Sequence, residues 1–225
     1  MFLIKEKFEK SINTYDKNAI VQKEMADKLI SLINKKDFDS ILEIGSYTGL
    51  LTKKVIQNFN FKNYLALDIV DSFDFIKNLN SKIEFKLADI NNIKLDQKFD
   101  LIITNACLQW CDDLNSTLNR LKSNLNHKGI LAFTTFGIDN LKEIKEVFSL
   151  SLNYLSKDEI KKILPDAIII EQTRTLEFKN AVEALRHLKL TGVNSLRKNC
   201  TITKQQLKTL GNKLTFNPIY VVYQK

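Results

Sequence analysis

Apolar residues along the chain follow two spacings, compact runs and helical stripes. Compact runs of strand length span residues 40–45, 63–70, 99–106 and 129–136, and apolar residues alternate with polar ones over Lys82–Ile90. Continuous apolar runs are typical of strands buried on both faces, while alternation indicates a strand with one polar face. The pattern therefore predicts five strands within the first 136 residues.

Between these strands the apolar residues are three or four positions apart, as on one face of a helix. Such stripes cover Ala19–Ile33, Thr48–Phe59, Phe73–Leu79 and Asp112–Leu125. We expect Gly129 to lie in the turn that ends the last of them, since glycine favours helix C-terminal turns. Strands that alternate with helices predict an α/β fold with a mostly parallel sheet and helices on both faces.

The alternation stops after Phe136, where two helical stretches follow one another without a strand between them. This indicates a small helical insertion at about residues 140–165. Two more strands bring the sheet to seven, and we expect one domain over residues 1–225, with N-terminal docking or lid helices at about residues 1–35. The last predicted elements are the strand Ala167–Phe178, the helix Glu183–Leu190 and the strand Ile219–Tyr223.

Composition narrows the class of protein. A chain of 225 residues with 44% hydrophobic residues suits one globular core and excludes a disordered or fibrous protein. Lysine and arginine number 34 against 26 acidic residues, and the net charge of +8 favours an acidic partner. The basic residues form no block, so a nucleic acid is a less favoured partner than an acidic protein.

The first ten residues become charged too early for a signal peptide, and no apolar run is long enough to span a bilayer. We therefore expect a cytoplasmic monomer that does not enter membranes. Three cysteines, Cys107, Cys111 and Cys200, give no disulfide framework, and with only two histidines we expect no metal site.

Polar residues and glycines gather where the predicted strands end. In an open α/β sheet, ligands bind at the carboxyl ends of the strands, so these residues are candidates for a binding site. A carboxylate such as Asp68 can accept both hydroxyls of a ribose, although Asp68 and Asp89 could instead cap helices. The candidates are Glu43, Gly45 and Gly49 after the first strand, Asp68 after the second, Asp89 after the third and Asn105 after the fourth.

The turn after the first strand reads E-I-G-S-Y-T-G, with Tyr47 where a dinucleotide-binding turn has its middle glycine. A turn without that glycine lacks a cradle for a pyrophosphate. A nucleoside without phosphates, such as S-adenosylmethionine, tolerates the change better.

With this order of glycine turn and two acids, the chain resembles the class I S-adenosylmethionine-dependent methyltransferases, which have a Rossmann-like fold. Four segments narrow the resemblance to the malonyl-acyl carrier protein O-methyltransferases of biotin synthesis. They are Thr14-Tyr15-Asp16 with Ala19 and Gln22, Asn105–Cys111, Phe133–Phe136, and Leu185–Gly192. The similarity spans about Phe8 to Tyr223, and only Tyr47 departs from the small residues usual in the glycine turn.

The resemblance implies S-adenosylmethionine as the cofactor, S-adenosylhomocysteine as its product, and no metal. The acceptor would be the free carboxylate of malonyl-acyl carrier protein, with malonyl-coenzyme A as an open alternative. A carboxylate is ionised at pH 7 and needs no general base, only alignment and desolvation. The cofactor-binding residues would be Gln22, Glu43, Gly45, Ser46, Gly49, Asp68, Ile69, Asp89, Ile90 and Asn105.

Three side chains are candidates for catalysis. Arg186 and Lys189 lie three residues apart on one helical face and could grip the malonyl carboxylate, or could be a solvated basic face. Tyr15 could orient the carboxylate from a lid, or could merely anchor the N-terminal helix.

Gln109 and Trp110 are candidates for the substrate pocket, with ordinary packing as the alternative. Lys122, Arg197 and Lys198 are candidates for a basic rim that meets the carrier, with ordinary solvated surface as the alternative for each. Three rival functions stay open: a small-molecule O-methyltransferase, a non-catalytic partner-binding protein on the same fold and, less favoured, a nucleic-acid methyltransferase. The latter families resemble one another in an Asn/Asp-Pro-Pro-aromatic segment, which Asn105-Ala-Cys-Leu lacks.

Overall fold

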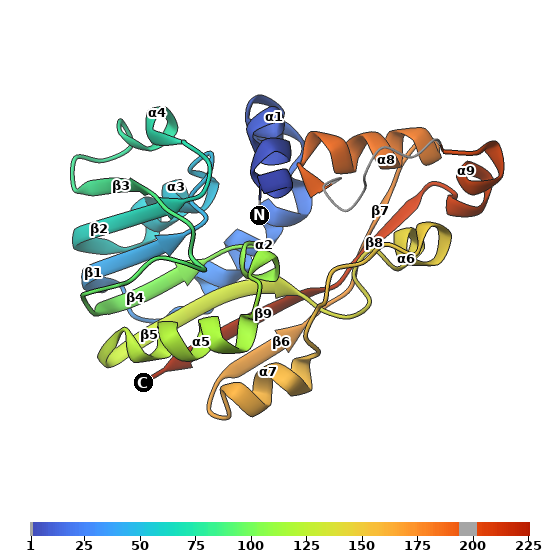
Figure 1. Cartoon of the computed structure of the whole chain (residues 1–225). Helices are drawn as coiled ribbons and strands as arrows, with labels where there is room; N and C mark the ends of the chain where they lie inside the picture. Colours follow the sequence, from blue (N-terminus) through green and yellow to red (C-terminus); the bar gives the residue numbers. More distant parts are fainter. Residues whose placement is uncertain (1, 194–201) are drawn as a thin grey trace.

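A seven-stranded sheet forms the centre of the molecule (Figure 1). The structure, a computed structural model, describes residues 2–193 and 202–225. The strands lie in the order β3-β2-β1-β4-β5-β9-β6, and only β9 runs antiparallel to its neighbours. The predicted seven-stranded, mostly parallel sheet is thereby confirmed. The strands are β1 (Asp37–Ile44), β2 (Asn60–Asp68), β3 (Ile83–Leu87), β4 (Phe99–Thr104), β5 (Leu125–Phe136), β6 (Ile168–Glu171) and β9 (Pro218–Gln224).

Both faces of this sheet are covered by helices, which explains the continuous apolar runs in its central strands. On one face α2 (Ile20–Ser31) and α3 (Leu50–Asn58) pack over Ile41 and Ile103, which are fully buried. On the other face α5 (Leu114–Ser123) and α7 (Lys157–Ile163) pack over Leu42 and Ile102. Successive residues of β1 and β4 thus point to opposite faces, as the two-residue repeat of a strand requires.

A further layer lies beyond the carboxyl edge of the sheet. A two-stranded antiparallel sheet and three helices share one apolar cluster there, built around Phe136, Leu188 and Phe216. The N-terminal helix α1 (Phe2–Asn18) packs beside α8 in this layer (Figure 1). The other members are β7 (Arg174–Glu177), β8 (Lys213–Phe216), α6 (Lys142–Phe148), α8 (Ala181–Leu190) and α9 (Lys204–Leu210).

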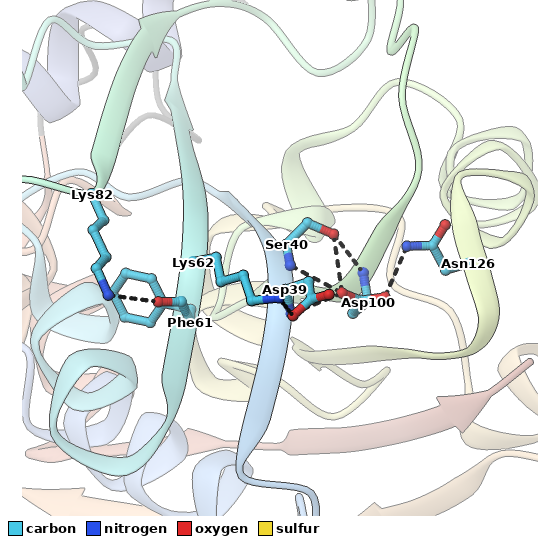
Figure 2. A network of polar contacts seen from close by, with 7 residues as sticks. All are labelled: Asp39, Ser40, Phe61, Lys62, Lys82, Asp100 and Asn126. Carbon is cyan, nitrogen blue, oxygen red and sulfur yellow. Dashed lines mark hydrogen bonds and ion pairs between the residues drawn. The ribbon is translucent and has the colours of Figure 1, made fainter.

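At the opposite, amino-terminal side of the sheet, Asp100 ties three strands together (Figure 2). Its carboxylate accepts hydrogen bonds from the backbone N–H groups of Asp39 and Ser40 at 2.9 and 3.0 Å and from Asn126 Nδ2 at 2.8 Å. Partial burial opposes ionisation, but the hydrogen bonds from Asn126, Ser40 and Asp39 outweigh it and hold the pKa of Asp100 below its usual value. Lys62 pairs with Asp39 at 2.9 Å beside this network.

Two sequence-based predictions about element boundaries are wrong. Gly129 lies within β5 and not in a helix C-terminal turn, because β5 begins at Leu125, which pairs with Phe99. The pairing register then shifts between Phe99 and Leu101, and Lys128 has a left-handed φ of 59°. A bulge thus accommodates the residues between Leu125 and Ile130 within the strand. The predicted strand Ala167–Phe178 is two strands, because β6 pairs with β9 while β7 turns away to pair with β8.

Two elements, α9 and β8, were not predicted, and α1 falls within residues 1–35, where docking or lid helices were expected without bounds of their own. The signal for α1 is nevertheless present, since Ile4, Phe8, Ile12 and Tyr15 are spaced four, four and three residues apart. The two predicted helices of residues 140–165 exist as α6 and α7, and residues 1–35 contain α1 and α2. No described helix is long and apolar enough to cross a membrane.

Candidate active site

A cavity of about 90 Å³ lies at the carboxyl ends of β1, β2, β3 and β4. Each strand contributes to its wall the residues that follow or end it, as expected for an open α/β sheet. Helix α1 contributes Ile4, Phe8 and Tyr15 from the other side. The remaining lining residues are Ile44, Gly45, Tyr47, Leu67, Asp68, Ile69, Val70, Ala88, Asp89, Ile90, Asn105, Ala106, Cys107, Trp110 and Cys111.

Asp68 is the buried acid of this cavity. It ends β2, is 7% exposed, and accepts hydrogen bonds from the backbone N–H groups of Tyr47 and Val70, both at 2.8 Å. Burial raises its pKa to about 6, and the backbone hydrogen bonds oppose that rise. A carboxylate has about four acceptor positions, so two backbone donors leave capacity for a ligand's hydroxyl groups.

Gly45 lets the backbone run close to the cavity wall. Its φ of 77° favours glycine, and a Cβ there would lie 2.6 Å from Cys107 Sγ. Gly49, with φ of 75°, begins α3 away from the cavity, where a Cβ would meet Leu79 at 2.9 Å. Ser46 is buried and also does not line the cavity, although its hydroxyl has no hydrogen-bond partner within the described residues.

Glu43 lies in β1, just before the glycine turn, and does not line the cavity. It is fully buried and accepts hydrogen bonds from Thr52 Oγ1 at 2.7 Å and Tyr64 OH at 2.5 Å. Burial raises its pKa to about 7, although both hydrogen bonds favour the charged form. Glu43, Ser46 and Gly49 thus lie behind the residues that line the cavity, and their contact with a cofactor stays a prediction.

The other predicted cofactor residues do line the cavity, with one exception. Ile69, Asp89, Ile90 and Asn105 all belong to its wall. Asp89 accepts a hydrogen bond from the backbone N–H of Asn91 at 2.9 Å, which fixes the loop after β3.

The exception is Gln22, which lies on α2 and does not contact this cavity. Asn105 Nδ2 donates to its backbone oxygen at 3.0 Å, so Gln22 braces the Asn105 loop. Its side chain lines a second, adjacent cavity.

That second cavity has a volume of about 20 Å³. Phe8, Tyr15, Ala106 and Trp110 line both cavities, so they form the wall between them. Both predicted substrate-pocket residues line the second cavity. Its other lining residues are Gln22, Gln109, Phe136, Asn140, Leu141, Leu152, Tyr154, Thr191, Val193 and Phe216.

Tyr47 holds α1 against the first cavity through hydrogen bonds and a ring contact. Its hydroxyl donates to the backbone oxygen of Phe8 at 2.6 Å and lies 3.1 Å from Ser11 Oγ. Its ring makes an edge contact with Tyr15 at a centroid distance of 4.8 Å. The backbone of Tyr47 has a φ of 42°, an uncommon conformation for a residue with a side chain.

Arg186 and Lys189 do not reach either cavity. Ala184 and Leu188 turn the buried face of α8 inward, which leaves both cations exposed. Arg186 is 65% exposed and pairs with Glu183 at 3.6 Å. The expectation that they point together into a cleft is therefore wrong.

Among the predicted rim residues, Lys122 lies on α5 with its Nζ 5.1 Å from the centre of the Tyr223 ring. Arg197 and Lys198 lie outside the described residues.

Sequence reasoning missed several wall residues, among them Phe8 and Cys107. Phe8 belongs to the four-residue spacing of α1, and Cys107 faces Gly45. Burial raises the pKa of the Cys107 thiol, which keeps it neutral.

The residues of the first cavity fit the nucleoside part of S-adenosylmethionine. Asp68 offers free acceptor capacity for ribose hydroxyls, and Ile69, Val70 and Ile90 offer apolar walls for a base. No described residue of the wall is a lysine, arginine or histidine, and Tyr47 stands where a pyrophosphate-binding turn has its middle glycine. The described residues also contain no group of three or more metal-ligating side chains.

Comparisons with known proteins agree with this geometry. Residues 17–217 match the model of a methyltransferase domain family. Among solved structures, the YcgJ protein of Bacillus subtilis aligns with a TM-score of 0.65 at 11% identity, covering 90% of this chain and 98% of that one. The N-methyltransferase NodS of Bradyrhizobium japonicum, in complex with S-adenosyl-L-homocysteine, aligns with a TM-score of 0.54 at 15% identity, covering 90% and 86%. These likenesses establish the fold.

Curated relatives are more similar in sequence. A malonyl-[acyl-carrier protein] O-methyltransferase of Calditerrivibrio nitroreducens is 36% identical, over 100% of this chain and 97% of the relative. One from Chlorobium luteolum is 30% identical, over 99% and 95%. Identity of this extent over whole chains goes well beyond a shared fold. The chain belongs to the malonyl-[acyl-carrier protein] O-methyltransferase family of methyltransferases.

Proposed function

We propose that the protein methylates the free carboxylate of malonyl-acyl carrier protein, with S-adenosylmethionine as methyl donor, in the synthesis of biotin. The observation that carries the proposal is the pair of adjacent cavities with a common wall of Phe8, Tyr15 and Trp110. One cavity fits a nucleoside, and the other lies where an acceptor would meet it. Family membership supports the malonyl carrier as that acceptor.

The cofactor cavity positions the donor through Asp68, Gly45 and the Asn105 loop, which the backbone oxygen of Gln22 holds in place. S-adenosylmethionine, when bound, supplies a methyl group on a positively charged sulfur, and that sulfur keeps the electron pair of the bond that breaks. The malonyl carboxylate is already ionised at pH 7 and brings the electron pair for the new carbon–oxygen bond, so no side chain has to remove a proton. The role of this chain's residues is therefore to align the carboxylate oxygen with the methyl group and to exclude water.

The exposed face of α8 suits contact with an acidic carrier. Arg186 and Lys189 lie on it, and Thr191 and Val193 just beyond it line the second cavity. The net charge of +8 would further speed the encounter with an acidic protein. We therefore assign Arg186 and Lys189 to carrier docking, and not to a grip on the malonyl carboxylate.

The test is methyl transfer from S-adenosylmethionine, read by intact mass, to malonyl-acyl carrier protein. Malonyl-coenzyme A, acetyl-acyl carrier protein, free malonate and RNA serve as parallel acceptors. We expect one added methyl group on malonyl carrier and none on acetyl carrier. Faster transfer to free malonate or to RNA would refute the proposal, and equal transfer to malonyl-coenzyme A would refute the carrier as the specific partner.

A further inference from the structure

Gln22 is a buried amide without a partner. It is 4% exposed, its buried Oε1 has no hydrogen-bond partner, and its Nε2 also donates no hydrogen bond within the described residues. A buried amide left unpaired costs free energy, so native proteins rarely keep one without a ligand or water to satisfy it. Gln22 lines the second cavity, so the free N–H groups of Nε2 are available there to an acceptor that carries a carboxylate.

The other free polar groups of this cavity are also neutral. Tyr15 makes no hydrogen bond through its hydroxyl within the described residues, and burial raises its pKa, so it keeps a proton to donate. Tyr154 OH accepts from Asn140 Nδ2 at 2.9 Å, which leaves its own proton free. None of the described residues that line the cavity is an Asp, Glu, Lys, Arg or His.

We propose that Gln22 determines specificity by holding the acceptor's carboxylate through hydrogen bonds from neutral donors, in a chamber where no described lining residue is a cation. The inference rests on the proposed function, since it takes a malonyl group as the acceptor. The Gln22 amide supplies N–H donors, and the Tyr15 and Tyr154 hydroxyls are the next donors in the same wall.

A neutral chamber suits this acceptor because the carboxylate loses its charge as the ester forms. A lysine or arginine would bind the charged acceptor more strongly than the transition state and so would hold the reaction back. Neutral donors orient the attacking carboxylate oxygen and stabilise the charged acceptor less, relative to the transition state, than a cation would. The ester product is neutral, so no unpaired charge remains in the chamber. The present volume of about 20 Å³ has room for about one water, so a malonyl group displaces side chains of the wall as it enters.

The experiment measures binding of S-malonyl-pantetheine by calorimetry to protein saturated with S-adenosylhomocysteine. That product carries no methyl group to transfer, so affinity is read without turnover. S-acetyl-pantetheine, which lacks the carboxylate, is measured in parallel, as is the affinity for S-adenosylhomocysteine itself.

Gln22→Met keeps the length of the side chain and removes the amide. We expect it to weaken the binding of S-malonyl-pantetheine about tenfold or more, the effect of one lost hydrogen bond to a charged group. Affinities for S-acetyl-pantetheine and S-adenosylhomocysteine should stay within about twofold, since Gln22 does not line the first cavity. Gln57→Met, on the exposed side of α3, is the matched control and should change none of the three.

Gln22→Glu is the second variant, should Gln22→Met fail to fold. It keeps the shape and places one carboxylate opposite another, so S-malonyl-pantetheine should bind more weakly than to wild type at pH 8. Unchanged malonyl affinity in a folded Gln22 variant, with binding intact in wild type, would overturn the inference alone. Wild-type protein that neither binds S-malonyl-pantetheine nor methylates malonyl carrier would overturn the inference together with the proposed function.

Discussion

Replacing Tyr47 with Phe removes one hydroxyl from the contact between the glycine turn and α1. That hydroxyl donates to Phe8 O at 2.6 Å and lies 3.1 Å from Ser11 Oγ, in a residue that is 8% exposed. The ring stays, and with it the edge contacts to Phe8 at 5.5 Å and to Tyr15 at 4.8 Å. The variant therefore tests the polar part of α1 docking alone.

The expected effect follows from the two contacts. Each neutral hydrogen bond contributes about 1 kcal/mol net, so the loss lowers the free energy of α1 docking by about 1–2 kcal/mol. That difference raises the population of undocked α1 by a factor of about 5 to 30. Since Ile4, Phe8 and Tyr15 of α1 line the first cavity, S-adenosylhomocysteine should also leave the variant faster than it leaves wild type.

Amide hydrogen exchange measures the opening of α1 directly. We expect the amides of α1 to exchange about 5 to 30 times faster in Tyr47→Phe, with little change in β1 and β4. Tyr223→Phe, which removes a hydroxyl from β9, is the control and should leave α1 unchanged. Wild-type exchange rates in α1 of folded Tyr47→Phe protein would refute the reasoning.

Three further changes test other parts of the site and the sheet. Burial raises the pKa of Glu43 from 4.5 to about 7, so the folded state holds an extra proton and its stability falls as pH rises between these values. Glu43→Gln should remove on the order of 3 kcal/mol of that fall, measured by urea denaturation at pH 5 and pH 8, and an unchanged pH dependence would contradict it. Gly45→Ala should cost about 2 kcal/mol or more in thermal denaturation. Adding Cys107→Gly to Gly45→Ala should restore part of the lost stability. Adding Cys107→Ala should not, because the Cβ of residue 107 would still lie 2.8 Å from the new methyl group. Asp100→Ala should lower the free energy of unfolding by about 2 kcal/mol, because the hydrogen bonds to its carboxylate are lost. The affinity for S-adenosylhomocysteine should not change, and weaker binding would contradict the separation of this network from the cofactor site.

The sheet and the first cavity were largely predictable because both follow from local signals. The apolar runs of β1 and β4 reflect burial on two faces, and parallel strands bring Gly45, Asp68 and Asn105 to one edge whatever the details of packing. The predicted boundaries of elements were wrong where pairing between distant strands decides them. Gly129 lies in a strand because Leu125 pairs with Phe99, a contact that no local pattern records.

The acceptor side was less predictable because it depends on how helices rotate against the sheet. The spacing of Arg186 and Lys189 correctly places them on one face of α8, but it does not say which way that face points. Burial of Ala184 and Leu188 decides it, and the cations face outward. Gln22 likewise lies on α2 while the other cofactor candidates follow strands, and only the packing of α2 shows that Gln22 lines a different cavity.

The wall between the two cavities makes their ligands thermodynamically linked. Phe8, Tyr15 and Trp110 each contact both spaces, so an occupant of one restricts the positions these rings take toward the other. By reciprocity, the factor by which bound nucleoside changes the affinity for acceptor equals the factor by which acceptor changes the affinity for nucleoside. We therefore expect a bound donor that orders these three rings to change the affinity of the second cavity for the acceptor, and the product to change it by a different factor.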